Sequence, residues 1–167
     1  MKRYLVPALF AAVTVCPCQH DNMASCPMHQ QHMKQKAVES RGDQAMGFSH
    51  EKTTHHFVLT QNGGLIEVRV NDLKDAASLD QTRSHFQHIV RMFADGNFNA
   101  PMLVHSQDVP GTAIMARHKT DLWELQEIPR GARITITSDN KEALDAVHDF
   151  LRFQIADHQT GDCTAIR

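Results

Sequence analysis

The chain has 167 residues, of which 41% are hydrophobic and 22% are charged, as expected for one globular domain. Its 17 Lys and Arg residues and 19 Asp and Glu residues give a formal net charge of -2. This balance argues against a nucleic-acid-binding protein and against a polybasic membrane-surface protein. Metal-binding residue types are abundant, with 12 His, 8 Met and 4 Cys.

Residues 1–15 have the pattern of a secretory signal peptide. Positive charges at positions 2 and 3 precede an apolar run that is shorter than the roughly 20 residues of a membrane-spanning helix. The run ends at Cys16 in a sequence that resembles a bacterial lipobox, with Val15 in place of its usual small residue. We therefore expect an exported protein, either periplasmic or lipid-anchored to the membrane through Cys16, in a compartment where disulfides form.

Residues 16–33 concentrate soft metal ligands, with three Cys, three His and three Met in eighteen positions. Thiolates and thioethers favour Cu(I), and imidazoles also suit Cu(II) and zinc. The four residues from Cys26 to His29 resemble the Cys-Pro-Met-His motif of heavy-metal-binding segments on bacterial copper and silver efflux proteins. We expect copper or zinc to bind here through Cys18, His20, Cys26, Met28, His29 and His32. The alternative is a spacer in which Cys18 and Cys26 form a disulfide or have no role.

Residues 16–46 show no apolar periodicity, and polar residues dominate after Met33. This pattern is typical of a flexible tail and linker. We therefore expect the folded domain to span residues 47–162, followed by a short C-terminal tail at 163–167.

The first half of this domain predicts a β-hairpin followed by a helix. Strands at 56–60 and 65–70 flank an Asn-Gly turn, which is the strongest short-range signal for a hairpin. Apolar residues at helical spacing then predict a helix over 75–94, with Gly96 ending it. Beyond this unit, the apolar run at 101–105 predicts a short edge strand, and 112–119 predicts a short helix.

The same order of elements recurs in the second half. Strands at 122–128 and 132–137 flank a Pro-Arg-Gly turn, and Asp139 or Asn140 caps a helix that runs to about His158. We therefore expect an α+β fold in two layers, with one antiparallel sheet and both helices on one of its faces. Two ββα units form a pseudo-repeat in this interpretation.

The two ends of the domain resemble a family of uncharacterised exported bacterial proteins. The likeness rests on residues 46–57 and 150–162, and it spans about residues 45 to 162. Members sometimes carry the label aspartate carbamoyltransferase, which does not suit this chain. The sequence lacks the Ser-Thr-Arg-Thr phosphate loop of that enzyme and has about half the length that its two-domain architecture needs. The resemblance implies export and a shared fold unit, and it implies no chemistry.

Histidines are the main candidates for a site within the domain. His85 and His88 lie one helical turn apart, and a pseudo-twofold axis would bring one of them near His148. His55 and His56 alternate along a strand, so that only one of them faces a given site. The predicted metal ligands of the domain are His55, His56, His85, His88, His148 and His158, a set suited to zinc or copper. The alternative is that each His caps a helix, bonds locally or faces water.

Motifs of the common catalytic classes are missing from the sequence. It has no Gly-x-Ser-x-Gly, no Gly-rich phosphate loop and no His-Glu-x-x-His. We therefore expect binding rather than catalysis, with a metal-dependent hydrolase or lyase as a third alternative. The first hypothesis is an extracytoplasmic bacterial protein that binds or handles copper or zinc. The second is a non-enzymatic domain that binds a small ligand or a protein.

Overall fold

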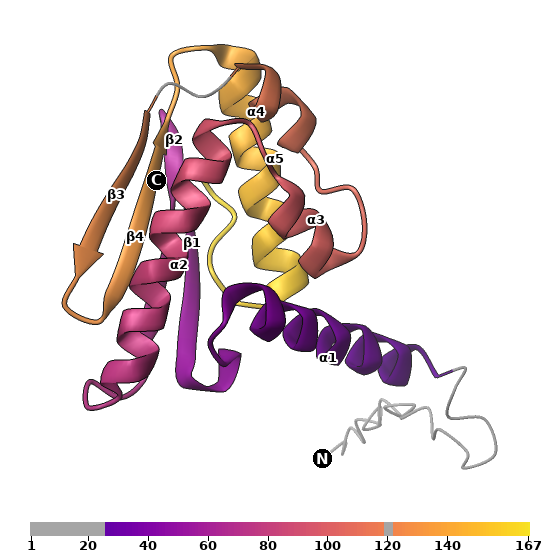
Figure 1. The fold of residues 1–167 in the computed structure, drawn as a ribbon. Helices are drawn as coiled ribbons and strands as arrows, with labels where there is room; N and C mark the ends of the chain where they lie inside the picture. The colour runs from indigo at the N-terminus through magenta and orange to yellow at the C-terminus, as the bar shows by residue number, and fades with distance from the viewer. Residues whose placement is uncertain (1–25, 119–121) are drawn as a thin grey trace, which may run out of the picture. The chain divides into compact units, whose positions relative to one another are not determined.

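The computed structural model describes residues 26–118 and 122–167 (Figure 1). The chain divides into two units, residues 1–33 and 34–167, and the second contains the whole sheet. The expected signal peptide, the lipobox-like Cys16 and the proposed ligands Cys18 and His20 lie outside the described residues. In the described part, no helix is long and apolar enough to cross a membrane.

Four antiparallel strands form one sheet in the order β1-β2-β4-β3. The strands are β1 (Thr53–Thr60), β2 (Gly63–Val70), β3 (Leu122–Ile128) and β4 (Gly131–Thr137). The two predicted hairpins join through their second strands, where Ile66 lies opposite Ile134. Because successive side chains point to opposite faces, Phe57 and Leu59 of β1 are buried on the same face as Val68 of β2.

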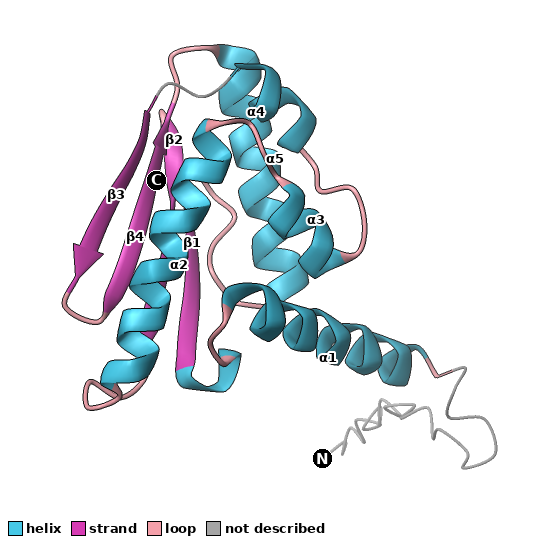
Figure 2. Ribbon diagram, in the orientation of Figure 1, coloured by secondary structure: helices cyan, strands magenta, loops and turns pink. Residues whose placement is uncertain are grey.

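Two long helices, α2 (Ala76–Ala94) and α5 (Lys141–His158), cover this apolar face, as Figure 2 shows. Asp75 and Asn140 cap them by accepting hydrogen bonds from backbone N–H groups of the first turn. Helix α2 packs mainly on β4 and β3, and α5 on β1 and β2, so each helix covers the hairpin of the other half. The predicted α+β fold with helices on one face is confirmed, and the order ββα occurs twice.

The prediction of an edge strand at 101–105 was wrong, because these residues belong to helix α3 (Asn99–His105). A short apolar run does not separate a strand from a buried helix by periodicity. Pro101 lies in the first turn, where a missing N–H costs no helical hydrogen bond. Val104 and His105 are buried. The predicted short helix at 112–119 is present as α4 (Thr112–His118).

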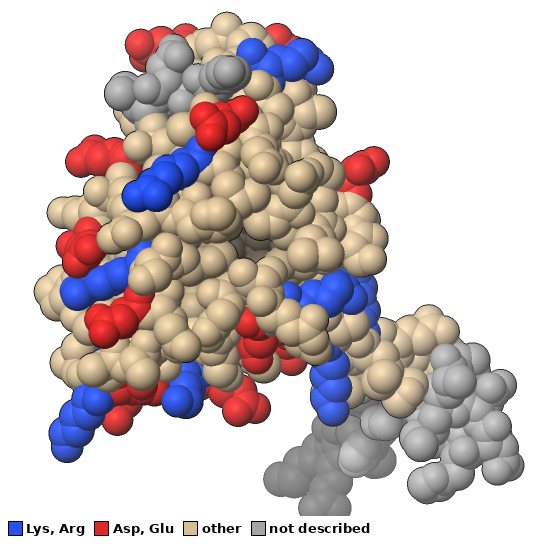
Figure 3. All heavy atoms as spheres, in the orientation of Figure 1, with Lys and Arg blue, Asp and Glu red and all other residues tan. Residues whose placement is uncertain are grey.

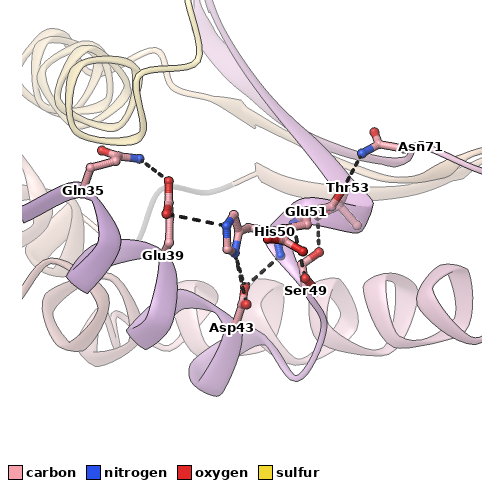
Figure 4. A network of polar contacts seen from close by, with 8 residues as sticks. All are labelled: Gln35, Glu39, Asp43, Ser49, His50, Glu51, Thr53 and Asn71. Carbon is pink, nitrogen blue, oxygen red and sulfur yellow. Dashed lines mark hydrogen bonds and ion pairs between the residues drawn. The ribbon is translucent and has the colours of Figure 1, made fainter. Parts of the chain in front are cut away.

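Helix α1 (Pro27–Met46) occupies most of the segment predicted to be a flexible linker. Its part within residues 34–167 is held by polar contacts and by the single buried aliphatic side chain of Val38. The Arg41 Nε donates to the Val104 carbonyl oxygen at 2.7 Å, and His50 lies between Glu39 and Asp43 (Figure 4). Such contacts leave no apolar stripe in the sequence, which is why periodicity missed the helix. His50 itself belongs to a single 3-10 turn, η2 (His50–Lys52).

Candidate functional site

A cavity of about 100 Å³ lies between the sheet and the helices, and its wall is largely apolar. Four histidines line it, contributed by β1, α2, α3 and α5. They are His55, His85, His105 and His158. The end of α1 closes another side through Ala45 and Met46. Figure 3 shows an uncharged, hollowed surface between α2 and α3, while Lys, Arg, Asp and Glu lie around it.

Three predicted ligand histidines, His55, His85 and His158, therefore lie on one cavity. The rings of His55 and His158 stack with centroids 5.7 Å apart and an angle of 1° between their planes. Phe48 links His55 to His85, because its ring lies 6.4 Å from the first and 5.7 Å from the second. The histidines are thus packed as parts of an aromatic wall.

Burial keeps these three imidazoles uncharged at neutral pH. Burial, and then the neighbouring His158 and His85, lower the pKa of His55 to about 3. Burial, assisted by His88, lowers the pKa of His85 to about 4. The pKa of His158 also falls to about 4, through burial and then the nearby His105, although Asp157 opposes the change. A neutral imidazole both donates and accepts one hydrogen bond, so the wall offers polar atoms without charge.

A chain of polar contacts runs from the surface to the cavity. Lys34 Nζ lies 2.7 Å from Asp157, and the other carboxylate oxygen lies 2.6 Å from Nδ1 of His105. The Nε2 of His105 lies 3.0 Å from the side-chain oxygen of Gln154. Burial opposes ionisation of Asp157, but its hydrogen bonds with Lys34 and His105 outweigh burial and lower its pKa. The carboxylate thereby orients His105, which in turn orients Gln154.

Gln154 is 4% exposed and lines the cavity. With its oxygen on His105, its Nε2 has no hydrogen-bond partner among the described residues. A buried amide donor without a partner loses about 1–3 kcal/mol relative to a bonded one. The Nε2 atom is itself fully buried, so this unsatisfied donor lies within the packed wall of the cavity.

The remaining predicted histidines of the domain lie elsewhere. His56 points to the opposite face of the sheet from His55, as alternation requires, and its Nδ1 lies 3.1 Å from Asp162. His88 is exposed on α2. His148 Nε2 lies 2.9 Å and 3.1 Å from the carbonyl oxygens of Thr60 and Gly63.

The expectation that His148 shares a site with His85 or His88 was wrong. His148 precedes the cavity residue His158 by ten positions on α5, or about 15 Å along a helix. It supports the turn of the first hairpin instead. Across residues 26–118 and 122–167, no three His, Cys, Asp or Glu side chains gather so as to hold a metal ion.

In comparisons with family models, curated proteins and solved structures, nothing matches this chain.

The N-terminal turns of α1 carry four candidate soft ligands. Met28 and His32 are separated by four residues, as are His29 and Met33, so each pair lies on one side of the helix. The side chains of Met28 and Met33 are exposed. Each pair places a thioether beside an imidazole.

Sequence reasoning missed His105 and Gln154. His105 belongs to residues 101–105, which were predicted to be a strand, so its position at the end of helix α3 was not expected. Gln154 had a usable signal, because it shares one face of α5 with Asp157 and His158 at spacings of three and four. Their contact with His105, 49 residues away from Gln154, was not visible in any local pattern.

Proposed function

We propose that the domain binds a small, mainly apolar ligand in the histidine-lined cavity. The observation that carries this proposal is the convergence of uncharged polar groups on one apolar cavity. Ligand sites in proteins commonly combine apolar walls, a few converging polar groups and shifted pKa values. An engineered cavity of roughly 150 Å³ takes benzene, so a cavity of about 100 Å³ suits a molecule of about five non-hydrogen atoms.

A cavity-filling variant tests this function in the full-length chain. Ala100 lines the cavity, so the larger side chain of Ala100→Leu should fill it. This variant should no longer bind the small apolar probe 2-methyl-1-butene, as measured by a ¹H–¹⁵N NMR titration. Ala77→Leu, at an exposed position on α2, is the matched control and should bind like the wild type. In the wild type, shifts should concentrate at residues that line the cavity. Binding that is absent in the wild type, or equal in both variants, would contradict the proposal.

Soft-metal binding by the N-terminal segment is the second candidate function. It is favoured by the thioether–imidazole pairs of α1, Met28 with His32 and His29 with Met33, which follow the cysteine-rich residues 16–26 in the sequence. Thioethers favour Cu(I), and imidazoles extend the range to Cu(II) and zinc. Export belongs to the same proposal and rests on the signal-like residues 1–15, on Cys16, and on the resemblance to exported bacterial proteins.

We expect a full-length variant with Met28→Leu, His29→Gln, His32→Gln and Met33→Leu to bind fewer Cu(I) ions per chain than the wild type. Truncation is unsuitable, because α1 continues into the domain, where Val38 is buried. The matched control, His85→Gln with His88→Gln, should keep the wild-type stoichiometry. Affinity should fall toward pH 5, because thiolate and imidazole ligands must lose protons to bind. If both variants bind the same number of Cu(I) ions per chain, the side chains of α1 are not copper ligands.

A further inference from the structure

The outer face of the sheet lies opposite to α2 and α5 (Figure 2). It holds an open trough of about 360 Å³. Residues directly opposite one another on paired strands share a face of the sheet. In one row, Glu67 of β2 lies between His56 of β1 and Arg133 of β4. In the next row, Val58 lies opposite Leu65. A polar row and an apolar row therefore lie side by side along the trough.

Glu67 holds two arginines at this face. Its side chain is buried, and Arg133 Nε donates to one of its oxygens at 2.6 Å, while Arg69 Nε pairs with the other oxygen. Among the residues that the structure describes, neither guanidinium has another hydrogen-bond or ion-pair partner. The side chains of Arg69 and Arg133 are 47% and 32% exposed, so a ligand reaches them. Because two guanidinium groups carry more N–H donors than one carboxylate accepts, donors remain for a further acceptor.

Positive charge is in surplus in the trough. The charged side chains that line it are Arg69, Arg133, Arg167, Glu67 and Asp162. Asp162 already faces other groups, because one oxygen accepts the backbone N–H of Phe57 at 2.9 Å and the other lies 3.1 Å from Nδ1 of His56. Glu124 of β3 shares the outer face but does not line the trough. With His56 neutral, three arginines against two carboxylates leave one positive charge, which a ligand with one negative charge offsets.

We propose that this trough binds small organic monocarboxylates, at a site separate from the cavity between the sheet and the helices. The ligand carboxylate accepts hydrogen bonds from Arg69 and Arg133, since its two oxygens match the planar fork of a guanidinium. Its alkyl chain lies on Val58 and Leu65, one row further along the strands. Rows on one face are about 7 Å apart, which a chain of about five carbons spans. Glu67 is a positioning residue, because it acts by holding the two arginines.

The test titrates hexanoate, hexanamide and acetate into the full-length protein. Hexanamide has the shape of hexanoate without its charge, and acetate has the charge without the alkyl chain. In ¹H–¹⁵N NMR spectra, hexanoate should move the Nε–H signals of Arg69 and Arg133 and the backbone signals of Val58 and Leu65. Because these arginines are partly exposed, we expect about millimolar affinity for hexanoate and about tenfold weaker binding of the other two. All titrations share one salt concentration, since salt screens exposed charges.

Arg69→Gln measures the contribution of one guanidinium. Glu67 remains paired with Arg133 in this variant, so the buried carboxylate keeps a partner. The ratio of the hexanoate affinity to the hexanamide affinity should fall about tenfold, the effect of about one charge-assisted hydrogen bond. The matched control, Arg91→Gln, removes the same charge from an exposed position of α2 and should keep the wild-type ratio.

Val58→Thr tests the contact with the alkyl chain, because Thr has the shape of Val with a hydroxyl in place of one methyl group. The ratio of the hexanoate affinity to the acetate affinity should fall about threefold. The proposal is overturned if the wild type does not bind hexanoate, or binds hexanoate and hexanamide equally. Equal losses in Arg69→Gln and Arg91→Gln would also overturn it, because they would indicate attraction by overall charge. An unchanged ratio in Val58→Thr would overturn the placement of the alkyl chain.

Discussion

Acidification from pH 7 to pH 5 is expected to destabilise the folded protein by several kcal/mol. Above pH 6.5, His55, His85 and His158 are neutral in both the folded and the unfolded chain. Below pH 6.5 the three imidazoles bind protons in the unfolded chain. In the folded chain they bind protons only when the pH approaches their lowered pKa values of about 3 to 4. The free energy of unfolding should therefore fall by about 1–2 kcal/mol for each ring over this range.

The groups that face these rings support the histidines as the cause of this pH dependence. His55 faces His158 and His85, and His158 also faces His105 with Asp157 beyond it. Asp157 has its pKa lowered below 3.8, so its protonation affects stability only in more acidic solution. Between pH 6.5 and 4.5 the histidines therefore dominate the change.

Urea unfolding, followed by the fluorescence of Trp123, gives the measurement. This single Trp packs against Phe93 and Phe98 in the core, with ring centroids 5.0 Å and 6.1 Å away. His158→Gln should flatten the dependence on pH, because one half-buried group with a lowered pKa is lost. The exposed His88→Gln is the control and should keep the wild-type slope. A wild-type stability that is constant from pH 7 to 5 would show that the histidines are not held neutral.

Gly111→Ala should destabilise the protein by about 4 kcal/mol, the scale of a severe core substitution. Gly111 has a φ of 81°, which other L-residues rarely adopt, and a Cβ atom there would lie 2.1 Å from the carbonyl oxygen of Ala146 on α5. Because that oxygen belongs to the backbone, a change of rotamer does not relieve the clash. Helix α5 carries Gln154 and His158, so the loss would also disturb the cavity.

Gly161→Ala separates the two contributions to this effect. Gly161 has a φ of 76°, but no atom of the described residues outside its chain neighbours lies within 4 Å of its Cβ position. Its substitution should cost only the backbone strain of about 1–2 kcal/mol. Urea midpoints of both variants, compared with the wild type, give the difference that comes from the close approach of Gly111 to α5. Equal losses in the two variants would show that strain alone accounts for Gly111.

Most regular elements of the domain were predictable from local sequence. The Asn-Gly turn and the alternating residues of 56–70 identified the first hairpin, and the apolar spacing of 75–94 identified α2. Alternation also separated His55 from His56 correctly. Helix α1 and helix α3 were missed for opposite reasons, because one lacks an apolar stripe and the other is too short to show a period.

The candidate site was predictable only in part. His55, His85 and His158 were candidates from their residue type, but their shared cavity depends on how β1, α2 and α5 pack. His105 and Gln154 meet across 49 residues, and His105 meets Asp157 across 52. Nothing in the neighbourhood of either residue signals its partner.

The sequence by itself determined both hairpins, the helices α2, α4 and α5 and the face of each hairpin that is buried, because these follow from contacts between residues a few positions apart. Only the tertiary structure decided that α2 covers the second hairpin and α5 the first, and that four histidines and Gln154 line one cavity. The physical reason is that apolar burial is not specific to one partner, whereas hydrogen bonds such as those of His105 require atoms brought together from distant parts of the chain.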